Sequence, residues 1–450
     1  MTSQAEAPRL GKFSWALFDW ANQPYFTVIT TFIFAPYFTA TVVGDSVTGQ
    51  AYWGYTQAVA GFIIAIMSPI LGSVADAGGP RKPWIFTFVL ICALASISLW
   101  WAVPGMTSGL IWILAAIVVG TIAVEFSLVF NNAMLPNLTS SENMGKLSGF
   151  GWGLGYLGGL IALFIVLVGF SMPEEPLFGL DKVSHEHDRM TGPLTGIWFL
   201  IFILPMMFFT PDAKSAGISR GVAVQKGFSS LIETLRGVKN HRNVVYFLIA
   251  RMFYNDGILA LIGFSGIYAA GVFGWETMTL GIFGILINVF AIAGSFIGGW
   301  LDDRLGSKPT IVISVLGLSF ASVGVLSIGD GEVLFGIPAA MPVEGGGVFE
   351  SPAEQVFMGF AVIMGIFFGP AQAASRTLVA RLSPPEKMTE FFGLFALSGK
   401  ATAFMAPLLI GVVTSLTGEQ RPAMLVILIL LLIGAALMSF VEENHRRKSA

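Results

Sequence analysis

Charged side chains are scarce in this sequence. Asp, Glu, Lys and Arg make up 11% of its 450 residues, less than half of the share of about a quarter that is usual in soluble domains. So few charges cannot cover a water-facing surface when 55% of the residues are hydrophobic. The composition therefore excludes a soluble enzyme and a disordered chain, and it indicates a protein that crosses a membrane several times.

Cysteine and histidine are also rare. The single cysteine, Cys92, lies in an apolar run and cannot form an intrachain disulfide. All four histidines lie outside the apolar runs, so we expect no metal site and no cofactor. The net charge of −3 indicates no nucleic-acid partner. The histidines are His185, His187, His241 and His445.

What the sequence does hold is a series of apolar runs, each long enough for a helix of about 20 residues to cross the hydrocarbon layer. Six runs are followed by a polar interval and then by six more. The sequence therefore predicts an all-α polytopic membrane protein with twelve transmembrane helices. The runs lie at about 13–40, 51–75, 83–104, 108–135, 147–172, 194–210, 244–273, 276–301, 309–329, 354–378, 391–416 and 421–441.

The basic residues predict the orientation of these helices. With the N-terminus in the cytoplasm, 19 of the 24 Lys and Arg residues fall on the inside, 3 fall on the outside, and Arg251 and Lys400 lie within runs. This bias matches the positive-inside rule, so we expect both termini to be cytoplasmic. The first run carries Asp19, Asn22 and Pro24 without a cleavage pattern, which indicates a retained helix that can bend at Pro24.

The polar interval predicts the domain organisation. Residues 1–210 and 244–450 are expected to form two six-helix bundles. Residues 211–243 are expected to form a basic inside linker, with a short amphipathic helix around Gln225–Lys239 that braces the two bundles. We assign no chemistry to the polar loops 173–193 and 329–353.

Two inside loops repeat one pattern, 227 residues apart. We call residues 72–82 the first signature loop and residues 299–308 the second signature loop. A second repeat, 244 residues apart, relates Gly149 and Gly155 to Gly393 and Gly399. Parallel repeats of six helices imply a pseudo-two-fold axis along the membrane normal. The residues of the loop pattern are Gly72, Asp76, Arg81 and Lys82, and Gly299, Asp303, Arg304, Gly306 and Lys308.

An Asp beside a helix end and basic residues on the same loop can form a charged latch that breaks when the inside opens. The alternative is that these charges only set the topology. The pattern Gly-x-x-x-Asp-(Arg)-x-Gly-x-(Arg/Lys) resembles the signature of the major facilitator superfamily. The first loop departs from it at Ala77, where a basic residue is usual, and at Pro80, so we expect a thinner charge network there.

Three further motifs resemble the vacuole-effluxer-like branch of that superfamily, which includes a fungal vacuolar amino-acid effluxer. The resemblance implies two pseudo-symmetric six-helix bundles, a transporter rather than an enzyme, and a monomer in the plasma (inner) membrane. The motifs are Trp15-Ala-Leu-Phe-Asp19-Trp-Ala-Asn22, Gly149-Phe-Gly-Trp-Gly-Leu-Gly-Tyr-Leu-Gly158-Gly159 and Phe391-Phe-Gly-Leu-Phe-Ala-Leu-Ser-Gly-Lys400.

Ionisable residues inside the spans are the candidate transport residues, because each costs about 2.5–3.5 kcal/mol at the helix centre on insertion scales. Asp19 and Asn22 share a face of the first helix, although Asp19 could instead cap backbone freed near Pro24. Glu125 lies in the fourth span, where apolar surroundings favour its protonated form; its alternative role is a structural partner for an Arg or a helix end. Asn131 and Asn132 follow it.

The second half offers a similar set. Asp256 lies near the middle of the seventh span, close to Tyr254 and Asn255, whereas Arg251 is shallower and could reach the inner surface. Lys400 lies in the eleventh span. It is expected either to pair with an acidic residue of another helix or to neutralise a substrate carboxylate.

Charges of both signs within the spans favour a small amphipathic solute, with amino acids first, moved by alternating access and coupled to protons. A sugar, a drug-like or lipid-derived solute, or a facilitator without proton coupling is the alternative. An intramembrane enzyme is a remote one, because no histidine or suitable acid pair lies within the spans. The expected partners are a small-molecule substrate, H⁺ and the lipid bilayer.

Overall fold

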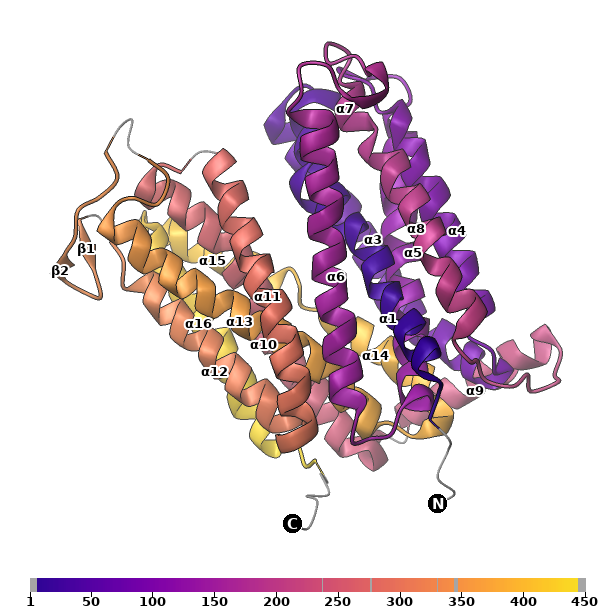
Figure 1. Cartoon of the computed structure of the whole chain (residues 1–450). Helices are drawn as coiled ribbons and strands as arrows, with labels where there is room; N and C mark the ends of the chain where they lie inside the picture. The colour runs from indigo at the N-terminus through magenta and orange to yellow at the C-terminus, as the bar shows by residue number, and fades with distance from the viewer. Residues whose placement is uncertain (1–5, 237, 276, 330, 344–346, 444–450) are drawn as a thin grey trace. The chain divides into compact units, whose positions relative to one another are not determined.

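The chain is almost entirely helical (Figure 1). The computed structural model describes residues 6–236, 238–275, 277–329, 331–343 and 347–443, so the predicted inside residues Arg446, Arg447 and Lys448 lie outside the described part. Within the described residues, twelve helical segments are long and apolar enough to cross a membrane, which confirms the predicted number. They are Arg9–Val42, Thr48–Gly78, Lys82–Trp101, Leu110–Leu138, Met144–Ser171, Glu186–Phe209, Arg242–Phe273, Thr279–Leu305, Ser307–Leu326, Pro352–Leu382, Pro385–Thr417 and Gln420–Phe440.

Several spans combine more than one type of helix. The α-helices are α1 Arg9–Pro24, α2 Phe34–Tyr37, α3 Ser46–Gly78, α4 Lys82–Ser98, α5 Leu110–Leu138, α6 Met144–Val166, α7 Glu186–Arg189, α8 Thr191–Phe209, α9 Arg220–Arg236, α10 Arg242–Phe273, α11 Thr277–Leu305, α12 Ser307–Leu326, α13 Pro352–Leu382, α14 Met388–Lys400, α15 Met405–Thr417 and α16 Gln420–Leu437. The π-helical stretches are Tyr25–Phe32, Phe38–Val42 and Leu167–Ser171. The 3₁₀ turns are Leu99–Trp101, Leu177–Gly179, Val238–His241, Pro385–Lys387 and Met438–Phe440, and the two strands are β1 Glu332–Val333 and β2 Ile337–Pro338.

Two spans depart from regular α-helix next to a proline. In the first span α1 ends at Pro24 and the chain continues as a π-helix, at the proline where the sequence predicts a bend. In the eleventh span α14 ends at Lys400 and α15 begins at Met405, whereas the sequence predicts an unbroken run. Pro407 explains the break, because it has no N–H to donate and its ring clashes with the carbonyl four residues earlier.

The described chain divides into two compact units that do not follow the order of the sequence. Compared with the two predicted bundles, each unit contains one segment from the other half of the sequence. Ser141–Gly153, the start of the fifth span, belongs to unit 2, and Ser383–Lys400, which includes α14, belongs to unit 1. Unit 1 consists of Met1–Ser140, Leu154–Arg236 and Ser383–Lys400, and unit 2 of Ser141–Gly153, Gly237–Leu382 and Ala401–Ala450.

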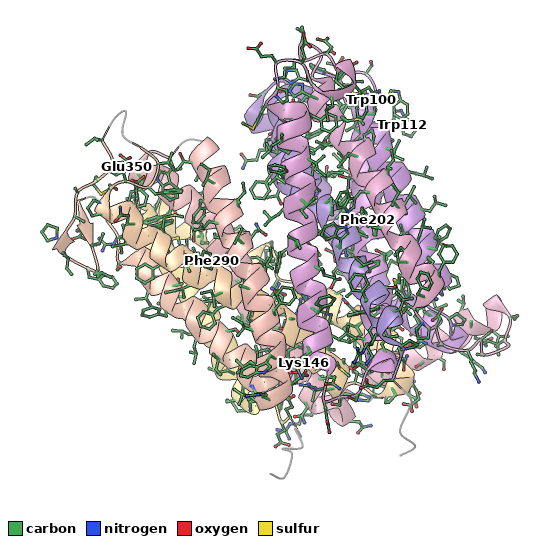
Figure 2. All side chains as sticks on the ribbon, in the orientation of Figure 1. Trp100, Trp112, Lys146, Phe202, Phe290 and Glu350 are labelled. Atoms are coloured by element: carbon green, nitrogen blue, oxygen red, sulfur yellow. The ribbon has the colours of Figure 1, made fainter. Side chains whose placement is uncertain are left out.

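In unit 1, α4 packs between α5 and α8, and α8 also packs on α1 (Figure 1). The helix α3 contacts α5, α14 and the linker helix α9. Trp112 of α5 is 76% exposed on the outside of this group (Figure 2). Apolar rings on the outer surface of a helix bundle are typical of a surface that meets lipid rather than water.

In unit 2, α13 packs between α11 and α12, and α16 packs between α10 and α12 (Figure 1). The strands β1 and β2 form a small antiparallel hairpin after α12. Phe320 of α12 is 60% exposed, as expected for a helix that faces lipid.

Candidate functional site

The first signature loop holds the beginning of α14. The carboxylate of Asp76 accepts hydrogen bonds from the backbone N–H groups of Thr389 at 3.1 Å and Glu390 at 2.9 Å, and from the Thr389 hydroxyl at 2.7 Å. Arg81 lies 2.6 Å from the same carboxylate, and both side chains are buried. A carboxylate is stabilised at this position because the first N–H groups of a helix lack intrahelical partners and carry partial positive charge.

The second signature loop holds the beginning of α6 in the same way. The carboxylate of Asp303 accepts hydrogen bonds from the N–H groups of Gly145 at 2.7 Å and Lys146 at 3.0 Å. Gly145 and Lys146 lie 244 residues before Thr389 and Glu390, which is the second spacing found in the sequence. The two sequence repeats are therefore structurally connected. The aspartate of each signature loop caps a helix that carries the glycines of the second repeat, α14 in the first case and α6 in the second.

As predicted, the charge network at the first loop is the thinner of the two among the described residues. Asp76 pairs with Arg81 at 2.6 Å, whereas the second loop joins Arg381 and Lys146 to the carboxylates of Asp302, Asp303 and Glu443. The pair at the first loop is nevertheless the closer one for its capping aspartate, because the distance from Arg381 to Asp303 is 3.6 Å.

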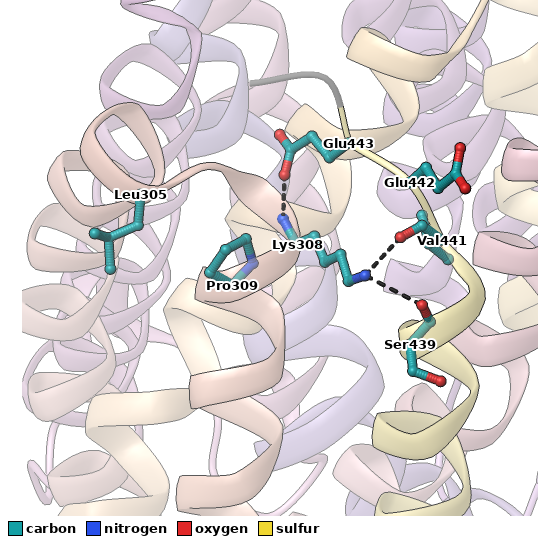
Figure 3. A pocket seen from close by; sticks show the side chains of 7 residues that line it. All are labelled: Leu305, Lys308, Pro309, Ser439, Val441, Glu442 and Glu443. Carbon is teal, nitrogen blue, oxygen red and sulfur yellow. Dashed lines mark hydrogen bonds between the residues drawn. The ribbon is translucent and has the colours of Figure 1, made fainter. Parts of the chain in front are cut away.

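A third repeated feature escaped the sequence analysis. Asp212 accepts hydrogen bonds from the N–H groups of Arg81 and Lys82 at 3.0 and 2.9 Å. Glu443 accepts them from the N–H groups of Ser307 at 3.0 Å and Lys308 at 2.7 Å, and Figure 3 shows the contact with Lys308. Each acidic residue follows the last helical residue of the sixth or twelfth span by three positions, a spacing of 231 residues that could have revealed the pair.

The lysines of both loops also bond to helix C-terminal carbonyls. Lys82 Nζ donates to Met207 O at 3.0 Å in unit 1. Lys308 Nζ donates to Val441 O at 2.6 Å and Ser439 O at 3.3 Å in unit 2, beside a cavity of about 410 Å³ (Figure 3). Arg304 does not join the network in the same way; its guanidinium lies 4.0 Å from the ring centroid of Trp300.

Unit 2 adds one arginine that serves several carboxylates. Arg381 Nη1 lies 2.5 Å from Asp302 and 3.2 Å from Glu443, and its Nη2 lies 3.6 Å from Asp303. All four side chains are buried. The sequence analysis counted Arg381 only as a topology charge, and its position at the end of α13 gave no sign of these partners.

The linker helix α9 contacts the same region of unit 1. It covers Arg220–Arg236, whereas the sequence predicts a helix around Gln225–Lys239. Ser230 donates to the Glu390 carboxylate at 3.2 Å, and Lys387 Nζ donates to Thr234 at 2.8 Å. The linker helix is therefore attached to both α3 and the beginning of α14.

Glycines allow the capped helices to approach closely. A Cβ at Gly72 would lie 2.4 Å from Thr389 O, and one at Gly299 would lie 2.6 Å from Gly145 O. A Cβ at Gly149 would lie 2.3 Å from Ser295 O, and one at Gly393 2.4 Å from Ser68 O. These four glycines are therefore packing positions, at which any side chain would displace a neighbouring helix, whereas a Cβ at Gly155 would make an ordinary contact with Asp19 at 3.4 Å.

Inside the spans of unit 1, Lys400 and Glu125 form an ion pair. Lys400 Nζ lies 2.7 Å from Glu125 Oε1, and the two side chains retain 32% and 16% of their surface exposed. Glu125 lies near the middle of α5, and Lys400 is the last residue of α14 before the break in the eleventh span. A cation at a helix C-terminus is favoured by the helix dipole.

The first span contributes buried polar residues to unit 1. Asp19 and Asn22 are both buried in α1, and the Asn22 amide donates to Phe18 O at 2.9 Å. Asp19 lies against Gly155 of the fifth span. Asn132 is partly exposed on α5, one residue after the fully buried Asn131.

In unit 2, the polar residues of α10 meet α13. The Tyr254 hydroxyl lies 2.7 Å from Ser375 Oγ, and Gln372 donates to Asn255 Oδ1 at 3.2 Å. Gln372 and Ser375 are not among the predicted site residues, because uncharged polar residues in a stretch of small residues give a weaker signal in the sequence than charges within a span do.

Two charged residues of α10 are buried beside this cluster. Among the described residues, neither carboxylate oxygen of Asp256 has a hydrogen-bond partner, although Thr402 and Arg251 lie close enough to act on its charge. Arg251 is only 7% exposed. It therefore does not extend to the inner surface, which was the alternative left open by the sequence.

Arg376 also differs from its prediction as an ordinary inside charge. It is 2% exposed and donates to the hydroxyl of Ser148 at 2.9 Å and to its carbonyl at 2.6 Å. Because Ser148 lies on α6, this arginine joins α13 to the start of the fifth span within unit 2.

The loop 173–193 holds a group of side chains that contradicts the expectation that no metal site can be built. One ligand atom each from His185, His187 and Asp188 lies within 4.8 Å of the other two. The expectation considered histidines only within the spans and overlooked that a tight turn outside them can gather three ligands.

Comparison with known proteins identifies the family. The family model described as "Vacuole effluxer Atg22 like" matches residues 38–450. The chain belongs to this family. It is also similar to the "Uncharacterized MFS-type transporter YxiO" of Bacillus subtilis, with 28% identity over 436 residues that cover 96% of this chain and 94% of that protein.

More distant relatives of this Atg22-like chain are fungal. "Autophagy-related protein 22-1" of Neosartorya fischeri is 23% identical over 318 residues, which cover 68% of this chain. That alignment covers 49% of the fungal protein, so the chain spans about half the length of this relative.

Solved structures agree with the family in fold. The proton:xylose symporter XylE bound to 6-bromo-6-deoxy-D-glucose has a TM-score of 0.68 and 14% identity, covering 97% of this chain and 95% of that one. The transporter FucP in the outward conformation has a TM-score of 0.66 and 15% identity, covering 97% and 99%. The Atg22-like chain is therefore a multi-pass membrane transporter of the major facilitator superfamily, as its sequence predicts.

Proposed function

We propose that this transporter moves amino acids across the plasma (inner) membrane by alternating access, coupled to protons and acting as a monomer with cytoplasmic termini. The observation that carries the proposal is the ion pair between Glu125 and Lys400, with N and O atoms 2.7 Å apart. Both residues lie near the middle of their spans, where a charge is costly unless it has a partner or a function.

The pair can be opened by an amino acid. The substrate carboxylate is the same chemical group as the Glu125 side chain, so it can replace Glu125 at Lys400. Neither side chain is sealed in packing, because 32% of Lys400 and 16% of Glu125 remain exposed. Lys400 is itself the last residue of α14, so the end of a helix lies at the pair, as in transporters that bind solutes at interrupted helices.

The released Glu125 links this exchange to protons. A carboxylate without a cation is costly in apolar surroundings, so it would take up a proton or bind the ammonium group of the substrate. Substrate binding and proton uptake would then depend on each other. We assign supporting roles in the substrate and proton pathway, each within its own unit, to Asp19, Asn22 and Asn132, and to Arg251, Tyr254 and Asp256.

The signature loops supply the gate in this proposal. Asp76 joins α3, a helix of the first predicted bundle, to α14, a helix of the second. Asp303 joins α11 to the beginning of α6 in the reverse sense. Both connections must break if the predicted bundles separate at the inside, so each Asp stabilises the state in which the inside is closed.

Flux into proteoliposomes tests the proposal directly. Wild-type protein is assayed with a panel of amino acids, sugars and lipid-derived solutes, with and without an imposed pH gradient. We expect amino-acid uptake that the gradient drives. Glu125→Gln should lose gradient-driven uptake while keeping exchange of the same solute, and Lys400→Gln should lose both by at least about tenfold, because a charge-assisted hydrogen bond contributes about 1.5–3 kcal/mol.

The pair Glu332–Arg421 provides the matched control. It has the same N–O distance of 2.7 Å, and Arg421 is about as exposed as Lys400, but Glu332 is 35% exposed and lies in the hairpin after α12, outside the spans. Glu332→Gln should leave flux unchanged. Proton coupling is contradicted if Asp19→Asn, Glu125→Gln and Asp256→Asn all leave gradient-driven uptake at the wild-type level, and the amino-acid assignment is contradicted if no amino acid is transported or competes.

A further inference from the structure

The loop between the fifth and sixth spans brings two imidazoles and a carboxylate together. His185 Nδ1 lies 2.9 Å from Asp188 Oδ2, and His187 Nε2 lies 3.3 Å from the same oxygen. The three ligand atoms lie within 4.8 Å of one another. None of these residues takes part in the ion pairs and helix caps described above.

The backbone of the loop is built to make these side chains converge. The Asp181 carboxylate accepts hydrogen bonds from the N–H groups of Val183 at 2.9 Å and Ser184 at 3.1 Å. His185 then has a φ of +56°, a left-handed conformation that is uncommon for residues other than glycine. The turn α7, Glu186–Arg189, follows at once. Strain of this kind is typical of binding sites.

Neighbouring elements of unit 1 fix the loop in place. The ring of Tyr37 stacks on His185 with the centroids 5.5 Å apart, and the Tyr37 hydroxyl donates to Ala102 O at 2.6 Å. Arg189 Nε donates to Trp100 O at 2.6 Å. The loop therefore contacts the ends of the first and third spans, so the ligands are held on a rigid base rather than on a free loop.

We propose that His185, His187 and Asp188 form a binding site for a borderline divalent cation, with Zn²⁺ as the reference ion. Two imidazole nitrogens and one carboxylate oxygen are the ligands that Zn²⁺ takes in sites with an open position for water. Mg²⁺ and Ca²⁺ are disfavoured because they require mostly oxygen ligands.

The surroundings predict a reversible site rather than a permanent structural one. The ligands supply one negative charge, and the two other charges that act on His187, those of Lys182 and Asp181, have opposite signs. Among the described residues, His187 Nδ1 has no hydrogen-bond partner, so the orienting contact that usually strengthens a metal-bound histidine is missing. The site should therefore exchange its ion readily.

Binding to the purified full-length protein, with its affinity tag removed, tests the site. Zn²⁺ is titrated by calorimetry, and Co²⁺ is followed by its visible absorption as a probe of nitrogen ligands. We expect one ion per chain and a thermal unfolding temperature that rises with the Zn²⁺ concentration. His187→Gln and Asp188→Asn should each weaken binding at least about tenfold, while Mg²⁺ gives no signal.

His241→Gln is the matched control, because it removes a histidine outside the cluster. It should bind Zn²⁺ as the wild type does. The unfolding temperature without metal shows whether each variant is folded, and Asp188→Glu provides a second, conservative test if Asp188→Asn is unstable, since it keeps the carboxylate and should retain binding. The proposal is overturned if wild-type protein binds no Zn²⁺, or if binding survives both cluster substitutions.

Discussion

The two signature loops cap helices in the same way but organise their charges differently. At the first loop, Asp76 and Arg81 form a pair with each other, and Asp212 binds only backbone N–H groups. At the second loop, Arg381 stands among three carboxylates.

The difference shows that the negative charge of a helix-capping acidic residue can be balanced in two ways. It can be balanced by one neighbouring cation, or by a cation that several carboxylates share. In the first case each charge depends on one neighbour. In the second, several buried carboxylates depend on one arginine, so that removing it affects all of them at once. The charge interactions at the first loop should therefore contribute to stability through several residues of unit 1, whereas those at the second loop should depend mainly on Arg381 in unit 2.

Replacing Arg381 should have the largest effect. Arg381→Met leaves Asp302, Asp303 and Glu443 buried without this cation, and breaking a buried ion pair costs about 3–5 kcal/mol. Arg81→Met should cost less, about 1–3 kcal/mol, because Asp76 keeps three hydrogen-bond donors. Unfolding of both variants in detergent measures the difference, and the comparison fails if Arg81→Met is equally destabilising.

Alanine at the loop glycines should have the next largest effect, and a similar one at both loops. Gly72→Ala and Gly299→Ala each place a Cβ against backbone at 2.4 and 2.6 Å, and overpacking of this kind costs about 1–3 kcal/mol. Gly61→Ala in α3 is the control, because nothing lies within 4 Å of its Cβ. It should be neutral or stabilising by up to about 1 kcal/mol in the same unfolding assay; a loss equal to that of Gly72→Ala would argue against close packing.

Removing the charge of the capping aspartates should have a moderate effect. Asp76→Asn and Asp303→Asn keep an oxygen acceptor but lose the interaction with the helix N-terminus, which contributes about 0.3–1 kcal/mol and up to about 2 when partly buried. Asp76→Asn should lose more than Asp303→Asn, because it also leaves the buried Arg81 without its carboxylate. In a Cys92→Ala background, both should label faster at a cysteine introduced at Met388 or Met144, which are buried at the beginning of the two capped helices. Unchanged labelling in both variants would contradict the proposed latch.

The smallest effect should come from the third repeated feature. Asp212→Asn weakens only contacts to backbone N–H groups and should cost about 0.5–1 kcal/mol. Glu443→Gln should cost more, because Glu443 also contacts Arg381 at 3.2 Å. Glu442→Gln, one residue earlier, serves as the control in the same unfolding measurements. Equal costs for Asp212→Asn and Glu443→Gln would show that the shared cation adds nothing.

Much of this fold follows from local sequence. Each of the twelve spans is visible as an apolar run because a helix satisfies its own backbone hydrogen bonds in lipid, and the structure confirms all twelve. The two loop repeats are also visible in the sequence. A glycine is needed where two helices pack closely and an aspartate where a helix begins, and the two residues must lie a fixed number of positions apart.

The partners of these residues could not be predicted in the same way. Glu125 and Lys400 were both identified as candidates, but nothing in the sequence joins two residues that lie 275 positions apart. Arg376 and Arg381 looked like topology charges, because their positions near the end of a span are equally compatible with water and with a buried partner.

The number of spans, the family and the positions of the repeated loops follow from the residues alone, because they depend on hydrophobicity and on spacing along one chain. Which charges pair, the packing of α14 in unit 1, and the convergence of His185, His187 and Asp188 are visible only in the folded chain. These features depend on how segments distant in sequence pack and on a single left-handed residue in a loop, and neither leaves a periodic trace in the sequence.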